Sequence, residues 1–260
     1  AKRLLDAQGM STGTPWLGLV YVLGVAPFAW FLIHPDPHVR GWLPDGERSE
    51  TDAAPPAGSG TPFPVAVRSR FFVAVSVGYV LTLGSQVGGI LQLVKLVEER
   101  TSSAAARYAI AALAMTSIVA RLIGGRIVTS FPLMKVTGLL AAVQAASMAG
   151  IAFSESTVAI YAAIVAFGAT VGNILMLQPL LVVQRFGVRE YPRIFSRSQL
   201  ITVVGTAGGP LLLGVLRDSA GGYRTAYLAA ATCSVLGAIV LLGGGSAEFA
   251  GDHVDEGAAT

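Results

Sequence analysis

The chain has 260 residues, of which 53% are hydrophobic and only 13% carry a charge. Because a soluble domain usually carries about 25% charged residues, this composition excludes an ordinary soluble domain and indicates a membrane protein. The formal net charge of +3 is small and spread along the sequence, so we expect no nucleic-acid partner.

The residue types that build hydrolytic or metal sites are scarce. Cys233, the single cysteine, lies in an apolar run and has no second cysteine with which to form a disulfide or a metal site. The three histidines, His34, His38 and His253, lie in polar segments. We therefore expect no catalytic residue, no metal, no cofactor and no enzymatic activity.

The first predicted membrane span covers Thr14–Ile33. Its twenty residues are enough to cross a bilayer at about 1.5 Å per residue. Trp16 and Trp30 lie near its two ends, where they are either interface anchors or ordinary packing residues. The chain opens AKRLLDAQGM, with no signal-peptide pattern and no initiator methionine, so we expect that an upstream part is missing.

Two polar segments divide the rest of the chain. Residues 34–69 are rich in Pro, Gly, Ser and charge and have no apolar period, which predicts a mobile cytoplasmic linker. Residues 245–260 are polar and acidic, which predicts a disordered cytoplasmic tail. The predicted organisation is one helix in 1–33, the linker, six helices in 70–244, and the tail.

The second span, about Arg70–Val94, contains small residues and amides. The spacing of Gly84 and Gly88 predicts a close contact with a neighbouring helix. Gln86 and Gln92 are polar groups at bilayer depth, where they either line a cavity or bond to another helix.

The third span, about Ala104–Gly125, carries Arg121 near its end. An ionisable side chain inside a membrane is costly and is often functional, although an arginine at this position also snorkels to the interface. Both interpretations stay open at the level of the sequence.

Two of the remaining four spans carry helix-contact or helix-bending signals. The fourth is about Leu133–Phe153, and the fifth, about Val158–Val183, has Gly168 and Gly172 at GxxxG spacing, followed by Asn173, Gln178 and Pro179. The sixth is about Phe195–Leu216 and the seventh about Tyr223–Leu242. In the sixth span, Gly205 and Gly209 are one turn apart and Pro210 interrupts the helical bonding, which indicates either a moving helix beside a cavity or a well-packed one.

The sequence therefore predicts an all-α membrane protein with seven spans, and basic residues orient it. With the linker in the cytoplasm, eleven basic residues are cytoplasmic: Arg40, Arg48, Arg68, Arg70, Arg121, Arg126, Lys135, Arg185, Arg189, Arg193 and Arg197. Seven lie on the opposite side: Lys2, Arg3, Lys95, Arg100, Arg107, Arg217 and Arg224.

Several motifs follow one another between Gln184 and Tyr227. They are Phe186-Gly187, Arg193-Ile194-Phe195, Gly209-Pro210, Gly214, Asp218, Gly222-Tyr223 and Ala226-Tyr227. In this order they resemble the penultimate region of the major facilitator superfamily, in its monocarboxylate and oxalate–formate branch. Leu43-Pro44-Asp45-Gly46 is similar to the stretch that follows the sixth span in that branch.

A cytoplasmic loop motif of the same family is matched in part. The segment GGRIVTSFPLMK, with Gly125 and Arg126, resembles the connector between the eighth and ninth family spans, and we group Arg185 and Arg193 with it. The usual Asp-Arg pair of the family falls on Thr129 and Ser130. Ser117 occupies the position at which animal-type monocarboxylate carriers have an aspartate that takes part in proton coupling.

The resemblance implies a secondary transporter that opens alternately to the two sides of a plasma or inner membrane. This chain would supply the carboxy-terminal six-helix half and the last helix of the amino-terminal half, so its partners would be the rest of that half, the lipid bilayer and a small organic anion such as a monocarboxylate. The candidate substrate contacts are Arg121, Gln86, Gln92, Asn173 and Gln178. The candidate hinge or gating residues are Gly84, Gly88, Gly168, Gly172, Gly209 and Pro210.

Three other functions are alternatives to transport. Seven spans also fit a receptor or scaffold, although such a protein does not need a long linker after its first span. A half-transporter without its other half could be inert. A membrane enzyme needs clustered His, Asp or Glu at bilayer depth, and the sequence has no such cluster.

Overall fold

The computed structural model describes residues 15, 19, 22–28, 30, 60–219 and 222–247, and it divides into two compact units, Ala1–Pro56 and Ala57–Thr260. In the first unit the described residues are helical. Half of the predicted first span, most of the linker and most of the tail lie outside the described residues.

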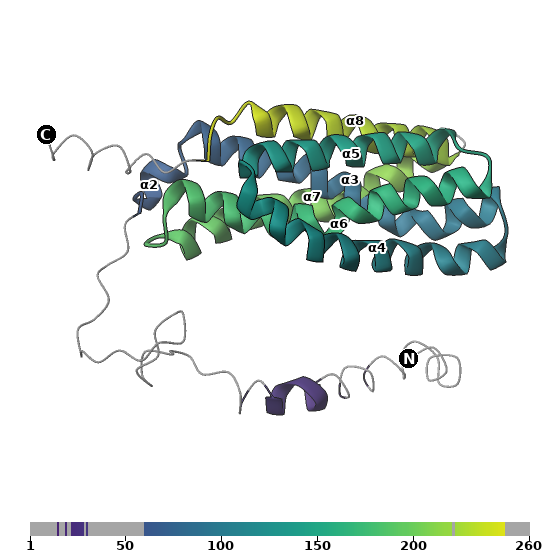
Figure 1. The fold of residues 1–260 in the computed structure, drawn as a ribbon, viewed down its shortest axis with the longest axis horizontal. Helices are drawn as coiled ribbons and strands as arrows, with labels where there is room; N and C mark the ends of the chain where they lie inside the picture. The colour runs from purple at the N-terminus through teal and green to yellow at the C-terminus, as the bar shows by residue number, and fades with distance from the viewer. Residues whose placement is uncertain are drawn as a thin grey trace, which may run out of the picture. The chain divides into compact units, whose positions relative to one another are not determined.

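The second unit is a bundle of six long helices preceded by a short one (Figure 1). The elements are α2 (Phe63–Ala66), α3 (Arg70–Arg100), α4 (Ser103–Ser130), α5 (Leu133–Phe153), α6 (Thr157–Phe186), α7 (Tyr191–Ser219) and α8 (Tyr223–Leu242). Six of the described helices, α3 to α8, are long and apolar enough to cross a membrane. The six spans predicted between Arg70 and Leu242 are therefore confirmed as helices, with the bounds of α5 and α8 as predicted.

Local signals explain where the helices begin and end. The Ser69 hydroxyl accepts the Phe72 amide at 3.1 Å at the start of α3, and Ser156 accepts the Ala159 amide at 3.2 Å at the start of α6. Gly187 ends α6 with a φ of 74°, which favours glycine. In lipid each helix must satisfy its own backbone, so the helices continue until such a signal stops them.

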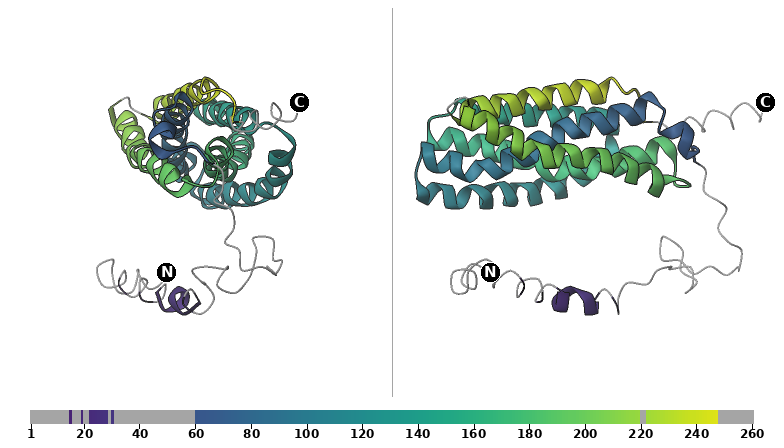
Figure 2. Two further views of the ribbon diagram at one scale, coloured as in Figure 1. Left: turned by 90° about the vertical axis from the view of Figure 1, so that its left-hand side faces the viewer. Right: turned by 180° about the vertical axis from the view of Figure 1, so that it is seen from behind.

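The helix α3 lies at the centre of the packing. It packs against α7, α8 and α4, whereas α5 packs against α8 and α6, and α4 packs against α6. Figure 2 shows the helices side by side from the end and from behind. In the most apolar window of α3, 72% of residues are buried, compared with 22% in α4 and in α7. The helices α4 and α7 therefore leave most of their surface uncovered by the bundle.

Two buried tyrosines tie the core to helix backbones. The Tyr79 hydroxyl donates to the carbonyl of Ile174 at 3.0 Å, and the Tyr227 hydroxyl donates to the carbonyl of Gly89 at 2.7 Å. Both side chains are fully buried, each in a different apolar cluster. Each tyrosine thus fills its cluster and still pairs its polar group, as burial requires.

Charge is distributed unequally between the two ends of the bundle. Among the described residues, nine basic residues and one acidic residue, a net +8, lie at or within three turns of the end where α3, α5 and α7 begin, which we call the basic end. They are Arg68, Arg70, Arg121, Arg126, Lys135, Arg185, Arg189, Arg193, Arg197 and Glu190. The opposite end carries five basic and four acidic described residues, a net +1.

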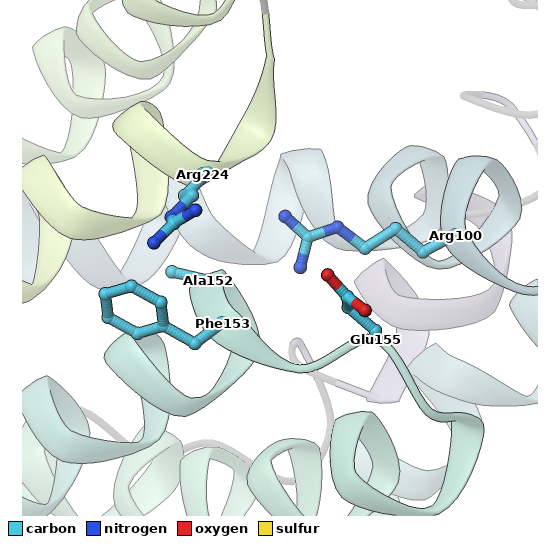
Figure 3. A pocket seen from close by; sticks show the side chains of 5 residues that line it. All are labelled: Arg100, Ala152, Phe153, Glu155 and Arg224. Atoms are coloured by element: carbon cyan, nitrogen blue, oxygen red, sulfur yellow. The ribbon is translucent and has the colours of Figure 1, made fainter.

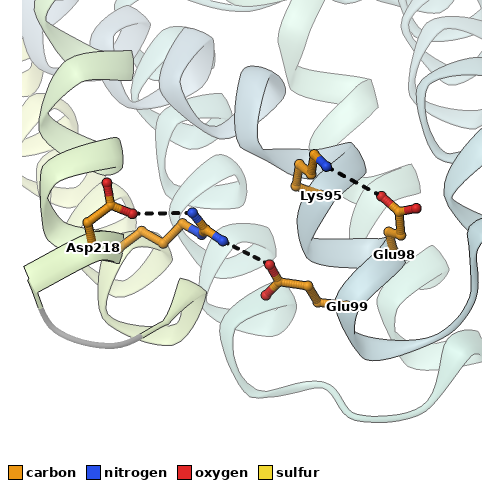
Figure 4. A network of polar contacts seen from close by, with 5 residues as sticks. Lys95, Glu98, Glu99 and Asp218 are labelled. Carbon is orange, nitrogen blue, oxygen red and sulfur yellow. Dashed lines mark hydrogen bonds and ion pairs between the residues drawn. The ribbon is translucent and has the colours of Figure 1, made fainter.

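Ion pairs join charged side chains at the opposite end (Figure 4). The Arg217 guanidinium lies 2.9 Å from the Glu99 carboxylate and 3.2 Å from that of Asp218. Lys95 lies 3.8 Å from Glu98, and both side chains are exposed. The charges of the helix ends that meet there therefore largely cancel. At the basic end, nine described basic residues have a single described carboxylate among them.

The last ten residues of the predicted linker are part of the bundle. Gly60 forms a bridge with Gly187, and the Thr61 amide donates to the Phe186 carbonyl at 2.8 Å. The Arg193 guanidinium of α7 lies 4.7 Å above the Phe63 ring of α2. Residues 60–69 thus differ from the predicted mobile segment because backbone bonds and an aromatic contact fix them to the α6–α7 turn.

Candidate functional site

The central helix α3 and the uncovered helix α7 meet at four glycines. A Cβ added to Gly84 would lie 2.9 Å from the Gly205 carbonyl oxygen, and one added to Gly88 would lie 2.9 Å from that of Gly209. A Cβ at Gly205 would collide with the Val80 carbonyl, and one at Gly209 with that of Gly84. The two glycine pairs predicted to allow close helix contact are therefore each other's partners. Their role as hinges stays a prediction.

The amide of Gln86 belongs to a buried network and not to an open cavity. It donates to the Gln144 oxygen at 2.7 Å, and the Gln144 amide donates to the Thr82 carbonyl at 2.9 Å and to the Ser234 hydroxyl at 2.9 Å. The Ser85 hydroxyl also joins, 2.7 Å from Ser234. Gln86 thus bonds to a neighbouring helix, and its role as a substrate contact stays a prediction.

Sequence reasoning missed Gln144, which connects α5 to α3 and α8. Its signal was available, because it is the single amide in the apolar run LLAAVQAASMAG. An amide in such a run has no water to bond and must pair with another helix. The same argument that selected Gln86 therefore also selects Gln144.

Arg121 lies deeper in its helix than predicted. The third span was predicted to end at Gly125, but α4 continues through Gly124 and Gly125 to Ser130, because lipid favours continued helix over the roughly 1 kcal/mol that each glycine costs. Arg121 therefore lies nine residues, about 14 Å of helix, from the end of α4. Its side chain remains exposed on the bundle.

The neighbours of Arg121 come from both α4 and α6. A Cβ added to Gly172 would collide with the Arg121 Nε atom and would lie 2.8 Å from the Ser117 hydroxyl. Gly172 therefore leaves room for the guanidinium to cross α6. Among the described residues no carboxylate forms an ion pair with Arg121. The arginine is thus a positioned cation without a fixed counter-charge.

Asn173 holds α4 and α6 together at the same level. Its amide donates to the Ala120 carbonyl at 3.1 Å and to the Ala169 carbonyl at 2.9 Å, while its oxygen has no partner and lies against Gly124. The structure therefore brings Asn173 next to the backbone that carries Arg121. Gly168, also in α6, packs against the Leu113 carbonyl of α4.

A second buried network surrounds Gln178. The Gln178 amide donates to the Ser198 hydroxyl at 3.1 Å and to the Thr202 hydroxyl at 3.0 Å, and Ser198 lies 3.0 Å from the Ser76 hydroxyl. The Gln178 oxygen is buried without a partner, as is that of Gln199 on α7. The network joins α3, α6 and α7 and leaves unpaired acceptors among them.

The remaining candidates lie apart from Arg121. Gln92 is half-buried on α3, and its amide would lie 3.6 Å from a Cβ added to Gly214. Pro210 lies inside α7, as Pro179 lies inside α6. The predicted loop motif lies in helices: Gly125 and Arg126 in the last turns of α4, Arg185 in the last turn of α6, and Arg193 in the first turn of α7.

At the opposite end of the bundle, two arginines line a pocket of about 410 Å³ (Figure 3). Arg100 donates to the carbonyls of Ile151 and Ser154 at 2.7 and 3.1 Å, which caps the end of α5. Arg224 lies 4.6 Å above the Phe153 ring. Both guanidinium groups thus hold α5 to its neighbours. Within the described residues no group of three or more His, Cys, Asp or Glu side chains could hold a metal ion.

Comparison with known proteins identifies the fold. No protein-family model and no curated protein matches the sequence. The E. coli fucose:proton symporter FucP, crystallised as a point variant, superposes with a TM-score of 0.64 at 17% identity over 95% of this chain and 61% of that one. A second FucP structure, described as a major facilitator superfamily transporter in the outward conformation, gives 0.63 at 17% identity, over 95% and 60%.

These matches show that the chain is a multi-pass all-α membrane protein with part of the major facilitator fold. It spans about three fifths of the length of the symporter.

Proposed function

We propose that the protein is a secondary active transporter of a small organic anion, such as a monocarboxylate, in a plasma or inner membrane. Support for transport comes from the fold, which FucP, described as a fucose:proton symporter, also has. In such folds two halves rock about a central site. The uncovered faces of α4 and α7 are available for a second half to cover.

The observation that carries the choice of an anion is Arg121. It is an exposed guanidinium well inside α4, with no described carboxylate paired to it. The membrane-crossing part of α4 ends at Arg126, five residues beyond Arg121, and a carboxylate that binds there can take two parallel N–H bonds from the guanidinium. The monocarboxylate branch of the superfamily, suggested by the motifs between Gln184 and Tyr227, is part of the same proposal.

Arg121→Ala is expected to lower uptake of the transported carboxylate at least about tenfold, because a hydrogen bond to a charged group contributes about 1.5–3 kcal/mol. Arg121→Lys should keep a part of the activity, since an ammonium holds a carboxylate as a point charge without the bidentate geometry. The measurement is uptake of labelled monocarboxylates by proteoliposomes that contain the full-length protein.

Arg107→Ala is the matched control, because Arg107 is an exposed arginine at the other end of the same helix. Gly172→Ala should also reduce uptake by displacing the guanidinium, whereas Gly125→Ala, whose Cβ meets nothing within 4 Å, should not. Full uptake by Arg121→Ala would rule out the anion contact. A folded wild-type protein that carries no carboxylate would rule out this class of substrate.

A further inference from the structure

A groove between α5 and α8 runs along the outside of the bundle. It has a volume of about 550 Å³, and α5 contributes small side chains at every turn: Gly138, Ala142, Ala145, Ala146 and Ala149. The α8 wall includes Val235, Ile239 and Leu242. The lining is thus almost wholly apolar, with Thr232 as its polar residue.

The length of this groove matches one leaflet of a membrane. From Gly138 to Ala149 is eleven residues of α5, or about 16 Å at 1.5 Å per residue. The hydrocarbon core of a bilayer is about 30 Å thick, so one leaflet is about 15 Å. The groove therefore has the length of one acyl chain, and it begins near the basic end of the bundle.

A second pocket lies next to the groove at the basic end, with the Leu242 side chain between the two. It has a volume of about 430 Å³, it shares Leu242 with the groove, and it is lined by Lys135, Gln184 and the segment Gly245–Ala247. Lys135 lies three residues before Gly138, one turn along α5. Its side chain is exposed, and no described carboxylate forms an ion pair with it.

We propose that the pocket at Lys135 and the α5–α8 groove together bind one anionic phospholipid, with the headgroup phosphate at Lys135 and an acyl chain in the groove. The net +8 of the basic end complements such a headgroup, and basic pockets between helices are known sites for anionic lipids. This inference does not depend on transport, because it concerns the face of α5 and α8 and not that of Arg121.

A second copy of the chain fits the groove less well than a lipid. A two-fold axis along the membrane normal would pair the same patch of both copies and place both Lys135 side chains at one level of the interface. Two Lys135 ammonium groups would then share the interface, with no described carboxylate paired to either. An anionic lipid relieves this charge, whereas a dimer doubles it.

The test is native mass spectrometry of the full-length protein in detergent with added phosphatidylglycerol or phosphatidylcholine of equal chain length. We expect tighter binding of phosphatidylglycerol, and Lys135→Ala should weaken that lipid about fivefold, the effect of one basic residue at a membrane surface. Lys95→Ala, which removes a 70% exposed lysine at the opposite end, should change nothing.

A second pair of variants tests the groove. Ala142→Phe should reduce binding of both lipids, whereas Ala162→Phe, at an exposed alanine on α6, should reduce neither. Unchanged phosphatidylglycerol binding by Lys135→Ala, or by Ala142→Phe, would overturn the proposal. Displacement of the lipid by glycerol phosphate at equal concentration would also overturn it, since the pocket would then bind a free anion. So would a dimer that Ala142→Phe dissociates without loss of lipid.

Discussion

Gly209→Ala is expected to lower the free energy of unfolding by about 1–3 kcal/mol, the range for an added group in a packed interior. The new methyl group would collide with the Gly84 carbonyl, which is backbone and cannot turn away. The helices α3 and α7 would have to separate along their whole contact. Thermal unfolding of the detergent-solubilised protein, followed by size-exclusion chromatography, measures the loss.

The neighbouring residue provides the control. A Cβ added to Gly208 meets nothing within 4 Å, so Gly208→Ala should raise the stability by up to about 1 kcal/mol through helix propensity alone. The double variant Gly84→Ala/Gly209→Ala should cost less than the sum of the single ones, because the first substitution already separates the helices. Equal effects at positions 208 and 209 would contradict the observed packing.

Gln144→Ala is expected to destabilise the bundle by about 2 kcal/mol. Gln144 accepts one hydrogen bond from Gln86 and donates its two amide hydrogens to acceptors on α3 and α8, and such bonds average about 0.6 kcal/mol in membrane proteins. Gln86→Ala removes one of them and should cost less. Gln184→Ala, at an exposed amide, should cost almost nothing. Equilibrium unfolding in mixed detergent and SDS micelles gives the three values.

The same series distinguishes the two roles considered for Gln86. A structural amide changes stability and leaves the KM of uptake unchanged, whereas a substrate contact changes KM in a protein of normal stability. The order Gln144, Gln86, Gln184 in destabilisation supports the structural role. A raised KM for Gln86→Ala without loss of stability would return Gln86 to the substrate path.

Apolar length alone was sufficient to predict α3 to α8, since six runs of about twenty residues have few alternatives in a membrane. Their ends were harder to predict. The third span was predicted to end at about Gly125, but the helix continues to Ser130, and Gly124 provides space for Asn173. A glycine in a sequence can either end a helix or provide space for a neighbouring helix. The arrangement of the helices decides which of the two it does.

In the candidate site, too, the sequence predicted residue types but not their partners. The spacings of Gly84/Gly88 and of Gly205/Gly209 each indicated a close helix contact. The sequence alone does not predict that these two pairs contact each other. Likewise the sequence marks Gln86 as a polar group at bilayer depth and Gln178 as a candidate substrate contact, while their partners Gln144 and Ser198 depend on how the helices are arranged. The residue types were predictable, and the pairing required the fold.

The bridge between Gly60 and Gly187 determines where a force along the preceding chain would first act on the bundle. Tension along the chain from before Gly60 reaches the bundle first at the Thr61–Phe186 hydrogen bond, and not at Arg70, where α3 begins. That bond joins the chain to the turn between α6, which carries Asn173 and Gln178, and α7, which carries two of the four contact glycines. A force on the chain before Gly60 would thus act first on the ends of α6 and α7.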